Sequence, residues 1–215
     1  MTRKGFLWWS MPILALTLLA TVLVYRHLPA TVPVHWNAAG EIDRYGAPGW
    51  VFTQPVILAF VTLLWAVLPG VSPDKFKVGS FSTTWWYCGI VIAALLAYIQ
   101  AVLLWGSSTG SIPMNRALLG GIGVGILLLG NVIGKVKRNF WLGVRTPWTL
   151  ASDRVWYATH RLAGKTMVAG GLVALVAALL GLPFHLGIGA IVIGALAPAV
   201  FSLVYYKRLE RTGGA

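Results

Sequence analysis

Charged residues are scarce in this sequence of 215 residues, and acidic residues are the scarcest. Asp, Glu, Lys and Arg together make up 10% of the chain, only five residues are acidic, and hydrophobic residues make up 58%. A chain of this composition carries more apolar surface than one soluble core can bury. The scarcity of charge therefore excludes an ordinary soluble domain and indicates that the lipid bilayer is the solvent.

Cysteine is nearly absent as well. The one cysteine, Cys88, has no partner within the chain, so a disulfide framework is excluded and a buried thiol is expected. Metal-ligand patterns are missing too: the spacing of His27, His35, Glu41 and Asp43 matches no known metal motif. We expect no metal site and no cofactor.

Six apolar runs remain, each close to the roughly 20 residues that a helix needs to cross a bilayer. They cover residues 6–25, 51–68, 84–105, 117–134, 166–183 and 186–206, and the last two are separated only by a tight connection around His185. The first run is too long for a signal peptide and lacks its cleavage site, so we interpret it as a retained helix. The sequence predicts an all-α, polytopic membrane protein with six transmembrane helices.

Basic residues predict the orientation of these helices, because Lys and Arg are retained on the cytoplasmic side of short loops. If the amino terminus is cytoplasmic, 14 of the 17 basic residues fall on the inner side, and the exceptions are Arg26, Arg44 and Arg116. We therefore expect both termini in the cytoplasm. The net charge of +12 then follows from topology and inner-leaflet lipid, and nucleic-acid binding is not needed to explain it.

No predicted span contains an ionisable residue. Proton-coupled carriers place such residues within the membrane, so a proton-relay transporter is disfavoured. Gln54, Gln100 and Asn131 are the main polar groups there, which leaves open a transporter or channel for a small neutral or lipid-like solute. In the fourth span, glycines four residues apart favour close helix packing within the chain over a dimer interface, and the oligomeric state stays open.

The predicted outer loop, residues 28–46, has an unusual composition. Pro29 and Pro33 favour an extended entry, and the Asn37 to Gly40 segment has turn chemistry. In the simplest interpretation, His35 and Asn37 bond to the backbone while Asp43 pairs with Arg44 or with a lipid headgroup. An alternative is a membrane enzyme that uses the His35 to Asp43 region, although we expect no enzyme because no general base can be identified.

The predicted inner loop, residues 135–165, is longer and basic. Residues 139–144 alternate partly and suit an extended segment, after which Thr146 or Ser152 can cap a short helix that ends near Gly164. One face of that helix is apolar, and it comprises Val155, Trp156, Thr159, Leu162 and Ala163. Such a segment lies in the membrane interface or docks a cytoplasmic protein, and composition favours the interface.

Residues 130–150 read GNVIGKVKRNFWLGVRTPWTL and are followed by Ser152, Trp156, Thr159, His160 and Gly164. This pattern resembles the signature of the SdpI family of bacterial immunity proteins over residues 125–205. The outer loop is similar to a small domain of unknown function that commonly precedes such a region, and the similarity rests on Pro33, His35, Trp36, Asn37, Gly40 and Asp43.

The resemblance implies a six-helix protein of the bacterial cell (inner) membrane. It also implies protection against a secreted, membrane-active toxin and retention of a cytoplasmic autorepressor at the membrane, so that the operon is expressed. The outer loop, with His35, Trp36, Asn37, Gly40 and Asp43, would then meet the toxin. The inner candidates for binding the repressor are Asn131, Lys135, Asn139, Gly143, Arg145, Thr146, Pro147, Trp148, Thr149, Trp156 and His160.

Part of the inner set has an equally good structural interpretation. Asn139, Arg145, Thr146, Pro147 and Trp148 are suited to a clamp in which Arg145 bonds carbonyls at the base of the loop. For the chain as a whole we expect an N-terminal helix pair with the outer loop (1–69), a middle helix (70–116), and an SdpI-like region (117–215). That last region contains the basic loop and a C-terminal helix hairpin.

Overall fold

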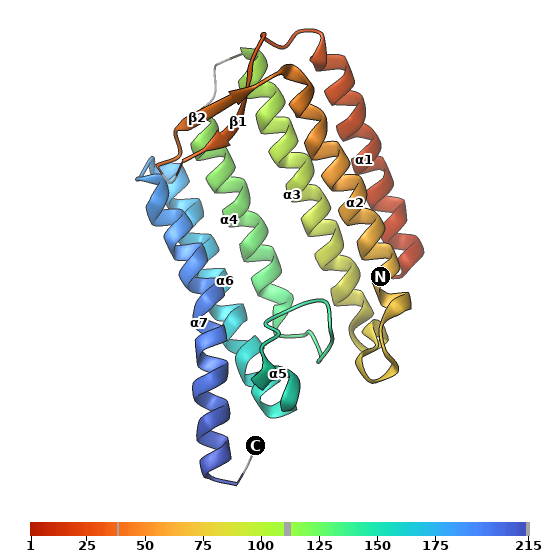
Figure 1. Ribbon diagram of the computed structural model, residues 1–215, viewed down its shortest axis with the longest axis vertical. Helices are drawn as coiled ribbons and strands as arrows, with labels where there is room; N and C mark the ends of the chain where they lie inside the picture. Colours follow the sequence, from red (N-terminus) through yellow and green to blue (C-terminus); the bar gives the residue numbers. More distant parts are fainter. Residues whose placement is uncertain (38, 110–112, 214–215) are drawn as a thin grey trace.

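Six long apolar helices lie side by side in the computed structural model, which describes residues 1–37, 39–109 and 113–213 (Figure 1). They are α1 (Arg3–Tyr25), α2 (Thr53–Val67), α3 (Ser82–Thr109), α4 (Met114–Ile133), α6 (Asp153–Leu180) and α7 (Phe184–Arg211). All six are long and apolar enough to cross a membrane. The predicted fold class, an all-α membrane protein with six spans, is confirmed.

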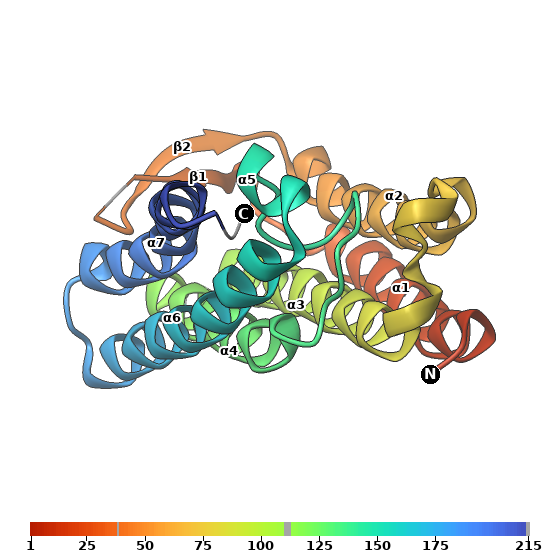
Figure 2. The same cartoon turned by 90° about the horizontal axis from the view of Figure 1, so that it is seen from below.

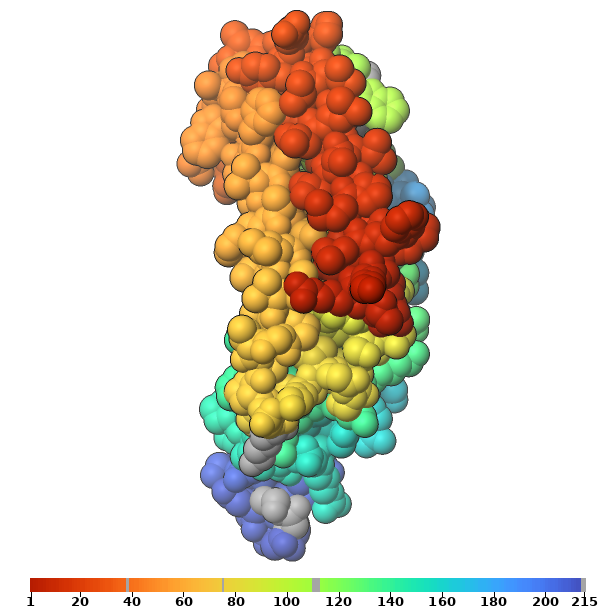
Figure 3. Space-filling view, turned by 90° about the vertical axis from the view of Figure 1, so that its right-hand side faces the viewer, coloured from red at the N-terminus to blue at the C-terminus, as the bar shows by residue number. Residues whose placement is uncertain are grey.

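The helices form two groups of three. Figure 2 shows α1, α2 and α3 on one side and α4, α6 and α7 on the other, and the groups meet where α3 packs against α4. Along one face of the first group, α1 and α2 run next to each other for most of the height of the molecule (Figure 3). Large apolar side chains such as Phe60, Leu63 and Val200 point outward, as expected of helices whose solvent is lipid.

Glycines let the helices of the second group approach closely. A Cβ added at Gly123 would lie 2.8 Å from the Gly171 carbonyl oxygen, and one added at Gly130 would lie 2.9 Å from the Val168 nitrogen. Because lipid supplies no hydrophobic drive between helices, such close approach provides the packing energy. Gly121 and Gly125 face Tyr98 and Leu95 of α3, so the glycines of α4 serve packing within the chain, as the sequence predicts.

The first group is held by aromatic and amide side chains. The indole nitrogens of Trp65 and Trp85 each donate to the other residue's carbonyl oxygen, at 2.8 and 3.2 Å, and the two rings stack. Gln100 is buried and donates to Thr21 Oγ1 and to the Val51 carbonyl, which ties α3 to α1 and to the start of the second span.

A small antiparallel β-hairpin covers one end of the bundle. Its strands are β1 (Val32–Trp36) and β2 (Ile42–Gly46), and the 3-10 helix η1 (Pro48–Phe52) leads from it into α2. The opposite end holds both termini, the short helix α5 (Pro147–Ala151) and three further 3-10 turns (Figure 1). These turns are η2 (Leu68–Val71), η3 (Asp74–Phe76) and η4 (Val78–Phe81).

The inner loop differs from the sequence-based expectation in three ways. Helix α6 begins at Asp153 and continues through Gly164, so the prediction that a short helix ends there is wrong. Glycine is needed at position 164 because an added Cβ would lie 3.0 Å from the Gly130 carbonyl oxygen. This glycine therefore serves helix packing and does not end the helix. Residues 139–144 form bends instead of an extended segment.

The third difference concerns the apolar face of this segment. Val155, Trp156, Thr159 and Ala163 are buried against the protein, and Trp156 and Ala163 belong to a core cluster that also includes Phe6 and Trp85. The predicted placement of this face in the membrane interface is therefore wrong. The face packs inward because α4 and the 134–146 segment lie directly against it.

Candidate functional site

The hairpin is organised by one asparagine. Asn37 Oδ1 accepts the backbone N–H groups of Ala39 and Glu41 at 2.9 and 3.0 Å, and Gly40 N donates to the Asn37 carbonyl at 2.9 Å. Gly40 has a φ of +80°, which favours glycine. The predicted turn from Asn37 to Gly40 and the predicted backbone bonds of Asn37 are therefore confirmed.

The turn also rests on the second helix group. A Cβ added at Gly40 would lie 2.8 Å from Phe184 at the start of α7 and 3.0 Å from Asn115 on α4. The hairpin belongs to the N-terminal half of the chain, so this contact joins the two groups at the hairpin end.

The acidic residue Asp43 pairs across the hairpin. Its Oδ1 lies 2.6 Å from His35 Nδ1, so the predicted pairing of Asp43 with Arg44 and the predicted backbone bond of His35 are both wrong. The register pairs His35 with Arg44 and Trp36 with Ile42, and Asp43 occupies the irregular position between these two pairs. Within the described part of the chain, no group of three or more His, Cys, Asp or Glu side chains is arranged to hold a metal ion.

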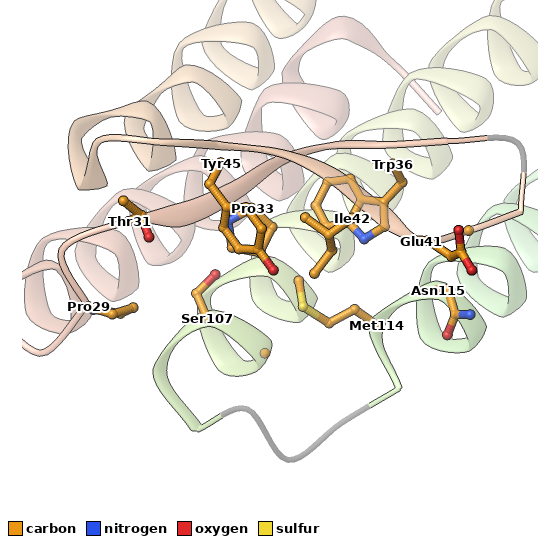
Figure 4. A pocket seen from close by; sticks show the side chains of 12 residues that line it. Pro29, Thr31, Pro33, Trp36, Glu41, Ile42, Tyr45, Ser107, Met114 and Asn115 are labelled. Carbon is orange, nitrogen blue, oxygen red and sulfur yellow. The ribbon is translucent and has the colours of Figure 1, made fainter.

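A pocket of about 470 Å³ lies beneath the hairpin (Figure 4). Trp36, Ile42 and Tyr45 from the strands face Ser107 of α3 and Met114 of α4 across it. Glu41 and Asn115 stand together at one end, and Pro29 and Thr31 stand at the other. We call this the hairpin pocket.

A second, larger hollow opens on the surface of the bundle along the seam between α3 and α4. Its volume is about 1120 Å³ and its lining is almost entirely apolar. Tyr98 crosses it and donates to the Ala117 carbonyl at 2.9 Å. At the hairpin end of the same hollow, Arg116 donates to the carbonyls of Ala178 and Leu179, and this accounts for two of the unpaired acceptors at the C-terminus of α6.

At the opposite end, residues 134–152 fold around two buried side chains. Asn139 is fully buried and makes four hydrogen bonds: Nδ2 donates to the carbonyls of Lys137 and Leu142, and Oδ1 accepts the N–H groups of Trp141 and Leu142. All of the hydrogen-bonding capacity of the amide is used.

The second buried side chain is His160 of α6. Nδ1 lies 2.8 Å from the Trp156 carbonyl and Nε2 accepts the Val144 N–H at 3.0 Å, which assigns the proton to Nδ1. The ring stacks on Trp156, whose indole donates to the Val136 carbonyl. Gly143, with a φ of +111°, must be glycine, because an added Cβ would lie 2.2 Å from His160 Nε2.

Thr146 and Thr149 complete this arrangement at the start of α5. They form a reciprocal capping box, Thr149 Oγ1 donates to the Val144 carbonyl, and Thr146 Oγ1 lies 2.9 Å from Ser202 Oγ on α7. Thr146 is thus the predicted cap, with Pro147 at the first helical position. We call the set Asn139, Gly143, Thr146, Thr149, Trp156 and His160 the inner clamp.

The side chains of Trp141, Ser72, Arg138 and Asp153 tie the inner clamp to its surroundings. Local sequence patterns gave no signal for Trp141, Ser72 or Asp153. Trp141 Nε1 donates to Ser72 Oγ at 2.7 Å, which links the clamp to the α2–α3 connection. Arg138 pairs with Asp153 at 3.0 Å and donates to the Leu150 carbonyl. Only the basic character of Arg138 was visible beforehand, because the partners are distant in sequence.

The remaining predicted residues lie outside the clamp. Lys135, Arg145 and Pro147 are exposed, Trp148 is half-buried, and Asn131 is exposed on α4 without a side-chain hydrogen bond to any described residue. Arg145 donates to the Phe140 carbonyl, the bond that the clamp interpretation predicts. Nearby, Lys77 lies 2.7 Å from Asp74 and its hydrogen bond and charge lower the pKa of that carboxyl.

Comparison with known proteins connects both ends to one family. Residues 135–206 match the model of the SdpI/YfhL protein family, and residues 13–59 match a domain of unknown function, DUF1648. The chain is 29% identical over 210 residues to a protein named Immunity protein SdpI from Bacillus subtilis, covering 94% of this chain and 96% of that protein. The chain is thus similar to the SdpI/YfhL family over residues 135–206 and to a named immunity protein over nearly its whole length.

A second relative, an uncharacterized protein of Archaeoglobus fulgidus, is 32% identical over 87 residues, or 37% of this chain and 48% of that protein. No solved structure matches the chain. The two matched segments contain the hairpin and all six residues of the inner clamp, so the ordered polar structure at each end lies within a recognised region.

Proposed function

We propose that this protein is a membrane immunity protein, which protects the cell that makes it against a membrane-active toxin arriving from outside. The observation that carries the proposal is the similarity to Immunity protein SdpI over 94% of the chain, including both structured ends. The exposed apolar helices and the hairpin provide surfaces at the depth where such a toxin acts. In this proposal the hairpin faces outward, and the termini and the inner clamp face the cytoplasm.

The direct test is protection. A sensitive bacterium that expresses the full chain is exposed to the candidate toxin of the source organism, and its membrane potential is followed with a voltage-sensitive dye. Protected cells are expected to keep their potential at toxin doses that depolarise cells carrying the empty vector. Equal depolarisation in the two strains, with the protein present in the membrane, would contradict the proposal.

We further propose that the clamp end holds a cytoplasmic autorepressor when toxin is present. Helix α7 supports such coupling because it is contacted at both ends: Gly40 of the hairpin packs on Phe184, and Thr146 of the inner clamp meets Ser202. The two contact points are 18 residues, or about 27 Å, apart along one helix. Suppose that α7 can adopt two positions and that the toxin binds one of them more tightly. Toxin binding then increases the population of that position, and the inner clamp, which contacts α7, changes with it.

This coupling is tested by Ser202→Ala, which removes the side-chain contact between α7 and Thr146. The variant is expected to keep its protection while losing most of the toxin-dependent movement of the repressor to the membrane, followed with a fluorescent fusion. Thr166→Ala on α6, which also removes a buried hydroxyl contact to α7, is the matched control. Loss of recruitment in both variants, or in neither, would contradict a path through Ser202.

One observation favours a second candidate, a transporter for a lipid-like solute. The hollow between α3 and α4 is large, apolar and open on the surface of the bundle. Purified protein in liposomes would then move a fluorescent lipid between leaflets, and a rate equal to that of empty liposomes would reject this candidate.

A further inference from the structure

Three of the five acidic side chains pair with a lysine or arginine, namely Asp74 with Lys77, Asp153 with Arg138 and Glu210 with Lys207, and Asp43 bonds to the imidazole of His35. Glu41 alone has no lysine, arginine or histidine partner among the residues that the structure describes. Its carboxylate accepts a hydrogen bond from the Asn37 side-chain amide at 3.0 Å and has no ion-pair partner there. Although the chain has a net charge of +12, no basic side chain in its described part contacts the Glu41 carboxylate.

Glu41 stands at one end of the hairpin pocket (Figure 4). It is the only charged side chain among the described residues that line the pocket, whose middle is formed by Trp36, Ile42 and Met114. Tyr45 lies further along the same wall. The pocket is therefore an elongated slot with an aromatic and apolar middle and a single negative charge at one end.

We propose that the hairpin pocket binds a cationic side chain, lysine or arginine, of the toxin peptide, with a neighbouring apolar residue in the middle of the slot. This inference rests on the proposed function for the origin of the peptide. Glu41 supplies a charge-assisted hydrogen bond, and indole and phenol faces attract cations. The negative end of the slot disfavours an acidic residue at the same position.

The chemistry is tested on the purified full-length protein in nanodiscs of neutral phosphatidylcholine. The probes are two capped tripeptides, leucine-lysine-leucine and leucine-glutamine-leucine, titrated by saturation-transfer NMR, which detects weak binding. The lysine peptide is expected to bind more tightly. Glu41→Gln keeps an acceptor for Asn37 and is expected to weaken the lysine peptide about fivefold, the upper range for a partly exposed ion pair.

Glu210→Gln is the matched control, because it removes the same charge at the opposite end of the molecule. It is expected to leave the dissociation constant of the lysine peptide unchanged. The proposal is overturned if the two peptides bind the wild type equally, or if Glu210→Gln weakens the lysine peptide as much as Glu41→Gln does.

A cellular arm separates this inference from the proposed function. Glu41→Gln is expected to raise the sensitivity of expressing cells to toxin, whereas Glu210→Gln is not. If the wild type and Glu41→Gln protect equally at every dose, the assignment of the pocket fails while the proposed function stands. If the wild type does not protect, the proposed function fails, and the tripeptide titration alone still decides what the pocket binds.

Discussion

Single buried polar side chains join segments that are far apart in this sequence. Gln100 connects three segments of the first helix group, Asn139 closes the inner loop on itself, and His160 joins that loop to α6. A buried polar group that loses its partner costs about 1–3 kcal/mol, more than the net gain from most single hydrogen bonds. The inner clamp therefore depends strongly on each of its members.

His160→Ala tests this dependence. The change leaves the Val144 N–H without its acceptor and a cavity beside Trp156, so we expect a loss of about 3 kcal/mol in the free energy of unfolding. The measurement is thermal loss of the monodisperse protein in detergent. His185→Ala, at an exposed position near the start of α7, is expected to leave the melting temperature unchanged. Equal melting temperatures for both variants would refute the clamp.

At the scale of elements, the second helix group is held together by backbone proximity. Gly123 and Gly171 place α4 against α6, while Gly170 and Gly194 place α6 against α7 at carbonyl distances that no side chain can share. The hairpin and α5 are small elements, and each gains its position from the helices beneath it.

Gly123→Ala tests the contact between α4 and α6. The new methyl group would lie 2.8 Å from a carbonyl oxygen and 3.0 Å from a backbone nitrogen, so the helices must separate. We expect a loss of about 2 kcal/mol and a melting temperature lower by about 5 °C. At Gly120, three residues earlier, the nearest atom would be 3.5 Å away, so Gly120→Ala should melt like the wild type. If Gly123→Ala and Gly120→Ala have the same melting temperature, the close approach of α4 and α6 does not contribute to stability.

The six helices could be predicted from the sequence, because an uncharged apolar run of about 20 residues normally forms a transmembrane helix in a bilayer. The start of α6 after Ser152 was among the predicted caps, but the continuation of this helix through Gly164 and the pairing of Asp43 could not be predicted. Gly164 resembles a helix end in sequence because its contact with α4 is not visible there, and Asp43 lies next to Arg44 in sequence but contacts His35 across the hairpin. The strands β1 and β2 were missed beyond their extended entry and turn, because five-residue strands with mixed polarity carry little periodic signal.

The sequence predicted which residues belong to the candidate site better than it predicted how these residues are arranged. Trp156 and His160 stack on each other inside the protein, and Asn139 and Thr146 bond within the adjoining loop and its helix start, so these signature positions hold the loop together. Contacts such as that between Val144 and His160 join residues 16 positions apart, and no local pattern records them. Lys135 and Arg145 are exposed cations beside the clamp, and with Asn131 and Pro147 they form the solvent-exposed part of the predicted inner set.

For the whole molecule, the account requires that the hairpin faces the outside and the inner clamp the cytoplasm. This is tested most directly with single cysteines at two glycines that have open space around them, Gly49 near the hairpin and Gly70 at the clamp end. The native Cys88 is buried and stays unlabelled. The account predicts that a membrane-impermeant maleimide labels Gly49→Cys in intact cells and labels Gly70→Cys only after lysis. Labelling of Gly70→Cys but not Gly49→Cys in intact cells would contradict it.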